Sequence, residues 1–160
     1  MDPLFHFFIS FSGGYVVLAE LYRKPKVKET LILSFLSVLI EIDHIFPVRV
    51  HVFHNIFILL VLLAISIFLL KDMMKVYGYL LSVMVFGHLL FDMVDESEVS
   101  LFFPFSRTAY TIPRSWGIML TPTSYLVNNF GIAIALYFVA VFLALLFLKR
   151  RKKEVYYDKE

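Results

Sequence analysis

The sequence predicts an all-α integral membrane protein with about five transmembrane helices. Of its 160 residues, 60% are hydrophobic and the mean hydropathy is +0.80, which is more than a soluble core requires. The apolar residues gather in five segments, each near the roughly 20 residues that cross a bilayer. Because backbone groups in lipid must be hydrogen-bonded within their own segment, we expect all five to be helices.

The five segments cover residues 4–22, 29–48, 52–70, 74–94 and 125–148. The first holds a Gly13-Gly14 pair and two serines, which favour close packing or a bend, so it either spans the membrane or enters it partway. Pro47 favours an end to the second helix. We expect residues 1–148 to form one helical domain and residues 149–160 to form a polar, basic tail.

The basic residues predict the orientation. Twelve Lys and Arg residues lie in the connection after the first segment, the connection after the third and the tail, whereas three arginines lie on the other side. By the positive-inside rule, the N-terminus is outside and the C-terminal tail is cytoplasmic.

Residues 93–124 join the last two segments and are too polar to span a bilayer. Their aromatic side chains, among them Phe102, Phe105 and Trp116, suit the headgroup level of a membrane. We therefore expect an aromatic interfacial loop between the fourth and fifth helices. Arg107 and Arg114 in this loop either bind a phosphate group of the substrate or are simply solvated.

Composition also excludes some classes of partner and chemistry. The chain has no cysteine, which excludes thiolate ligands and disulfides. Its formal charge is only +2 and its basic residues form short clusters between apolar runs, which argues against nucleic acid as a partner. A homo-oligomer remains open.

All five histidines fall at the predicted outer ends of the helices, together with several acids. An ionisable side chain at the centre of a membrane helix costs roughly 2.5–3.5 kcal/mol, so these groups need partners, water or a metal. We expect one site at the outer boundary. The candidate metal ligands are His6, Asp43, His44, His54, His88 and Asp92, with His51 as an additional candidate.

The ligand spacings leave alternatives open. His88 and Asp92 are four residues apart and share a helix face, so they could bind one ion, or His88 could be hydrogen-bonded within a helix pair. His51 could equally face water. Asp43 and His44 are adjacent and would point about 100° apart on an ideal helix, so the helix ends there or only one of them is a ligand.

Imidazole and carboxylate donors without thiolate suit Zn²⁺, Mn²⁺ or Fe²⁺ more than Mg²⁺ or Ca²⁺. The candidate ligands outnumber the three protein ligands of an open zinc site. One or two ions, or one ion with outer carboxylates, would account for this surplus.

The ordered motifs resemble the YdjM-like, LexA-regulated inner-membrane family of predicted metal-dependent hydrolases. The matching positions are His6, Glu41-Ile-Asp43-His44, His54-Asn55, Gly87-His88 to Asp92, and Pro104-Phe105. Glu41 stands where that family usually has aspartate, and Arg49 stands where it tends to have histidine. The resemblance implies a metal-dependent hydrolase.

The hypothesis is a membrane-embedded metal-dependent hydrolase that acts on a lipid phosphoester or a related headgroup bond. The metal would generate a nucleophile from water, and Glu41 or Asp43 would act as general base or bridging ligand. The alternative from another class is a metal-ion or proton transporter that uses the same cluster. Two further alternatives are a b-type haem protein and a purely structural metal site.

Overall fold

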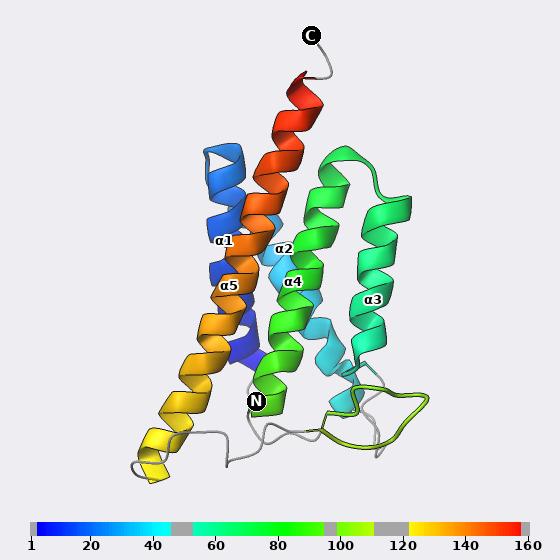
Figure 1. The fold of residues 1–160 in the computed structure, drawn as a ribbon, viewed down its shortest axis with the longest axis vertical. Coiled ribbons are helices and arrows are strands. Elements are labelled where there is room, and N and C mark those ends of the chain that lie inside the picture. Colours follow the sequence, from blue (N-terminus) through cyan, green and yellow to red (C-terminus); the bar gives the residue numbers. More distant parts are fainter. Residues whose placement is uncertain (1–2, 46–52, 95–98, 111–121, 158–160) are drawn as a thin grey trace.

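The computed structural model describes residues 3–45, 53–94, 99–110 and 122–157. Over these residues the protein is all-helical with five α-helices that run alternately up and down, which confirms the predicted all-α architecture and the number of helices (Figure 1). The helices are α1 (Pro3–Tyr22), α2 (Val27–Val38), α3 (Ile56–Ala64), α4 (Asp72–Val94) and α5 (Pro122–Tyr157). The 3-10 helix η1 (Leu39–Ile45) continues α2, and the π-helical turn η2 (Ile65–Leu69) continues α3.

Within the described ranges, three helical stretches are long and apolar enough to cross a membrane: Pro3–Tyr22, Met74–Val94 and Gly131–Arg150. The first of these is the segment whose ability to span was least certain from its composition. The stretch Ile56–Leu69 is apolar but shorter. The α-helical part of the second predicted segment covers only Val27–Val38, because the chain tightens there into η1.

Two helix ends differ from the predicted boundaries. α3 begins at Ile56 because Asn55 caps it: its side-chain oxygen accepts hydrogen bonds from the backbone N–H groups of Phe57 (2.9 Å) and Ile58 (3.1 Å). α5 continues to Tyr157, through the basic stretch expected to be a tail. Lys and Arg are good helix formers, so the helix extends past the apolar part.

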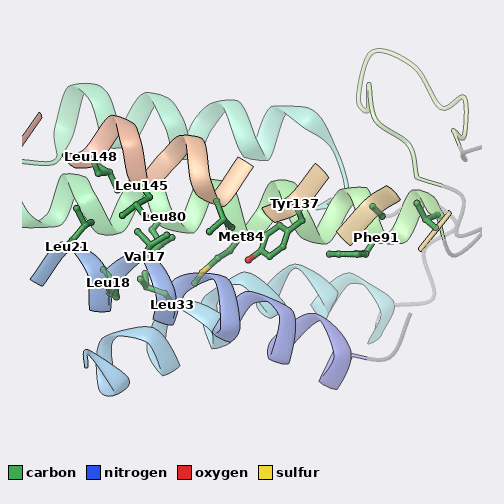
Figure 2. Packing of buried hydrophobic residues seen from close by; sticks show 13 residues of the cluster. Val17, Leu18, Leu21, Leu33, Leu80, Met84, Phe91, Tyr137, Leu145 and Leu148 are labelled. Carbon is green, nitrogen blue, oxygen red and sulfur yellow. The ribbon is translucent and has the colours of Figure 1, made fainter. Parts of the chain in front are cut away.

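α4 is the centre of the bundle and packs against α1, α2, α3 and α5. The main core cluster follows its length: Leu80, Met84 and Phe91 of α4 meet Val17 and Leu18 of α1 and residues of α5 (Figure 2). The surfaces turned away from this core carry many exposed large apolar side chains, among them Phe35 and Phe68. This distribution suits a bundle surrounded by lipid.

Tyr137 of α5 packs between α1 and α4 and so connects these three helices. Its side chain is fully buried, and its hydroxyl donates a 3.3 Å hydrogen bond to the Ile9 carbonyl of α1. A methyl group at either Gly13 or Gly87 would overlap the tyrosine ring, so both glycines are needed for the ring to fit between α1 and α4. Figure 2 shows the ring between Met84 and Phe91, with its hydroxyl toward α1.

We predict that Gly87→Ala lowers the stability of the protein by about 1–3 kcal/mol, the usual cost of overpacking a core. A lower thermal unfolding temperature in detergent would report this. Gly131→Ala is the matched control: beyond the backbone of its own helix, no atom of the described residues lies within 4 Å of the added carbon, so this variant should not lower the unfolding temperature. Equal stability of the two variants would contradict the packing role of Tyr137.

Candidate metal centre

One end of the bundle gathers the ionisable residues of four chain segments. They come from the first turns of α1, from η1, from the residue before the cap of α3, and from the last turns of α4. Figure 1 shows that these segments all lie at the end where the chain begins, opposite the α1–α2 and α3–α4 connections. The described residues therefore bring the predicted positions to one level of the bundle.

Four side chains form the centre of this cluster. His6, Glu41, His88 and Asp92 each offer one potential ligand atom, and these four atoms lie within 4.8 Å of one another. We refer to these four residues as the donor cluster. It could hold a metal ion.

Direct contacts connect the members of the donor cluster. His6 Nε2 is 3.0 Å from Asp92 Oδ1 and 3.8 Å from Glu41 Oε1. His88 Nε2 is 3.0 Å from Glu41 Oε1 and 3.3 Å from Asp92 Oδ2. A metal at about 2.0–2.1 Å from each donor separates opposite donors by at most about 4.2 Å, so the widest pair would only need to close slightly.

Local structure explains why these side chains converge. His88 and Asp92 are four residues apart on α4 and share a face of that helix. Gly87 lets Tyr137 pack beside them, which fixes the last turns of α4 against α5. Glu41 reaches the same point because the chain continues from α2 as η1 instead of turning away.

The directions of the ring nitrogens favour a common ligand over pairwise hydrogen bonds. Nε2 of His6 and Nε2 of His88 are buried, and within the described part of the chain neither forms a hydrogen bond of acceptable angle. This holds although a carboxylate oxygen lies 3.0 Å from each of them. A buried polar atom left in this state costs about 1–3 kcal/mol, and a cation bound between the nitrogens and carboxylates would remove that cost.

The imidazoles of His6 and His88 are stacked, with ring centroids 3.8 Å apart and an interplanar angle of 14°. The stacking places two potential metal-binding rings side by side next to the carboxylates of Glu41 and Asp92. Neutral imidazole is the form that binds metals.

His54 lies beside the donor cluster. Its Nε2 is 3.4 Å from Asp92 Oδ2, and its ring centroid is 5.4 Å from that of His88. The Asn55 cap fixes its position, as does a 3.0 Å backbone hydrogen bond from Ile56 N–H to the Leu101 carbonyl. His54 is therefore anchored both to α3 and to the loop that follows α4.

The remaining predicted site residues stand apart from this geometry. The backbone of Asp43 and His44 belongs to η1, but their side chains lie outside the described part, so their ligand roles stay predictions. His51 and Arg114 also lie outside the described residues. Arg107 is exposed, in a loop where the backbones of Val99 and Tyr110 pair.

Glu41 was expected as a general base or bridging ligand, and the structure places its carboxylate among the potential ligands. An apolar feature of the site was missed in the sequence. Phe5 and Phe91 pack edge to face at 5.5 Å and both lie near the His6 ring, forming an apolar wall. In the sequence, Phe5 precedes His6 and Phe91 precedes Asp92, and these positions could have indicated aromatic side chains beside the site.

Two imidazoles and two carboxylates form a donor set that suits zinc, manganese or iron in the divalent state. The cluster is buried in an apolar bundle, which strengthens electrostatic interactions inside it. Comparison with protein-family models, with curated proteins and with solved structures finds no match to this chain.

We predict that His88→Ala and Asp92→Ala each weaken zinc binding by more than about 100-fold, since even partners outside the ligand set cost about 10–100-fold. Metal content of the detergent-purified protein, measured by mass spectrometry after purification without chelators, gives the result. Glu20→Gln is the control, because Glu20 is exposed and pairs with Lys149 at 2.9 Å, away from the donor cluster. Full zinc content in both cluster variants would remove the assignment.

Proposed function

We propose that this protein is a membrane-embedded, metal-dependent hydrolase of a lipid phosphoester, with its site at the outer boundary of the bilayer. The observation that supports this most directly is the buried donor cluster of two histidines and two carboxylates at one end of an apolar helical bundle. A purely structural metal site has no need of an opening to an outside molecule. The Glu41 side chain, however, is 15% exposed, which favours a site that a substrate can reach.

A divalent metal held by the donor cluster would supply a Lewis acid and lower the pKa of bound water from 15.7 toward about 7. With Oε1 of Glu41 in the donor cluster, its second carboxylate oxygen, Oε2, is the best placed general base, since the Glu41 side chain is 15% exposed while those of His6, His88 and Asp92 are at most 4% exposed. It would accept the proton of the attacking water as the new P–O bond forms. It would then return that proton to the alkoxide released when the ester P–O bond breaks.

The surroundings of Glu41 support a lipid substrate. Leu39 and Ile42, its neighbours along η1, are each 44% exposed, and Phe53 beside His54 is 38% exposed. A molecule that reaches Glu41 would therefore pass apolar side chains. A lipid can match both parts of this surface, with its acyl chains against the apolar residues and its phosphoester at the carboxylate.

The arrangement in the membrane is part of the proposal. In addition to the three long apolar stretches, α2 with η1 and α3 with η2 would also lie within the bilayer, which gives five membrane segments. The basic connections at the far end of the bundle favour a cytoplasmic position for that end and an outer position for the donor cluster. The motif order that resembles the YdjM-like family supports the same activity.

A transporter would need a polar route onward from the donor cluster. Farther along α2 from the donor cluster, the buried hydroxyls of Ser34 and Thr30 each donate to a backbone carbonyl one turn back in the helix. These bonds satisfy the hydroxyls within the helix. They therefore support a one-sided site more than a pathway.

We predict that the zinc-loaded protein releases phosphate or a phosphomonoester from phospholipids in mixed micelles, and that Glu41→Gln lowers the rate by at least about 100-fold. This is the lower end of what a general base contributes. The measurement is product release, followed by mass spectrometry in mixed micelles of detergent with phosphatidylcholine, phosphatidylethanolamine, phosphatidylglycerol or phosphatidic acid.

Glu20→Gln serves as the control and should retain full activity, because Glu20 lies at the opposite end of α1. No hydrolysis of any of the four lipids by a zinc-loaded protein would contradict the proposed activity. Zinc uptake into proteoliposomes would then favour the transport alternative.

For topology, we predict that a reporter fused after Glu160 is cytoplasmic and that one fused before Met1 is outside. A phosphatase fusion, active only outside, and a fluorescent protein fusion, active in the cytoplasm, give opposite signals. Reversed signals would place the donor cluster on the cytoplasmic side and contradict an outer site.

A further inference from the structure

A hydrogen bond joins α1 and α2 directly beneath the donor cluster. Ser37 Oγ and Ser10 Oγ form a 3.0 Å hydrogen bond across the helix interface, and the Ser37 hydroxyl also forms a 2.8 Å hydrogen bond with the Ser34 carbonyl of its own helix. Both serines are buried, with 2% of Ser10 and none of Ser37 exposed. Nothing in the sequence pairs these two serines, which are 27 residues apart.

Each serine lies about one helical turn from a member of the donor cluster. Ser10 follows His6 by four residues on α1, so the two residues lie on the same face of that helix. Ser37 precedes Glu41 by four residues, where α2 passes into η1. The hydrogen bond therefore spans the same interface as the His6–Glu41 contact, about one helical turn farther from the end of the bundle.

Among the histidine–carboxylate contacts of the donor cluster, that between His6 Nε2 and Glu41 Oε1 is the widest, at 3.8 Å. This distance depends on the separation of α1 from α2 and η1. The distance between His88 and Asp92 does not depend on a helix interface, because both residues lie on α4. Metal–ligand distances tolerate only about 0.2 Å of variation. A small change in the α1–α2 separation would therefore act on this contact first.

The interface beside the serines is tightly packed. A methyl group at Gly14 of α1 would lie 3.3 Å from Thr30 Cγ2 of α2 and would overlap Met84 of α4. In an apolar bundle, interhelical hydrogen bonds and small residues supply much of the specificity of helix association. The Ser10–Ser37 bond thus has the position and the chemistry to fix how α1 sits on α2.

We propose that Ser10 and Ser37 are positioning residues for the metal site: their hydrogen bond sets the separation of His6 and Glu41 and thereby the affinity for the metal. This inference rests on the proposed metal-binding function. Neither serine contacts the metal. Their effect is transmitted through one turn of helix on each side.

The test measures zinc affinity of the full chain in detergent by competition with a chromophoric chelator, alongside the thermal unfolding temperature of the metal-free protein. Ser10→Ala and Ser37→Ala should each weaken zinc binding by about threefold to tenfold, the range that one hydrogen bond accounts for. The double variant should lose little more than either single variant, because both remove the same bond. Ser10→Thr, which keeps a hydroxyl, should recover most of the affinity.

Ser34→Ala is the matched control. Ser34 lies on the same helix, is equally buried and donates to the Thr30 carbonyl within α2, so its loss should leave zinc affinity unchanged. If all three alanine variants lower the unfolding temperature but keep wild-type zinc affinity, the serines act in packing alone and the inference is overturned. If the wild-type chain itself binds no zinc, that result contradicts the proposed metal-dependent function and with it the inference.

The absence of native cysteine allows a second test that does not depend on metal. The Ser10→Cys/Ser37→Cys variant should form a disulfide on mild oxidation, since the two side chains already touch. The Ser10→Cys/Ser34→Cys variant should form it far less readily. Absence of the first cross-link would overturn the close approach on which the inference depends.

Discussion

The structure depends on one constraint: ionisable side chains placed in an apolar bundle must satisfy one another. Each such group carries a cost of a few kcal/mol in a membrane, and that cost is reduced only where opposite charges, hydrogen-bonding groups or a cation meet it. Here the carboxylates of Glu41 and Asp92 meet the imidazoles of His6, His54 and His88. These contacts hold the start of α1, η1, the residue before the α3 cap and the end of α4 at one level of the bundle.

The apolar packing and the polar site share the same helix. α4 supplies Leu80, Met84 and Phe91 to the core and His88 and Asp92 to the cluster. The precision of the site therefore comes from the packing around it, above all from the close approach of α1, α4 and α5 around Tyr137. A donor set on a loosely packed helix would not keep its atoms within ligand distance.

The sequence predicted the helices and the common level of the ionisable residues, because hydropathy and charge respond to depth in a membrane. The four-residue spacing of His88 and Asp92 also predicted their shared face. Rotation of each helix about its axis could not be predicted, since an apolar segment shows little difference between its faces. For that reason the stacking of His6 on His88, the contact between Ser10 and Ser37 and the packing of Tyr137 emerged only in the structure. The length of α5 was underestimated because hydropathy measures its apolar part, not its helical extent.

The origin of the donors along the chain has a consequence for biosynthesis. His6 lies in the first helix and Asp92 at the end of the fourth, so the donor cluster is incomplete until the first four helices have been synthesised. Chains fold broadly from the N-terminus during synthesis. Until α4 arrives, His6 and Glu41 have only each other within the donor cluster, and α1 and α2 must remain in place by their own packing. A metal ion held by the donor cluster would therefore be acquired late, after the helices of the bundle have assembled.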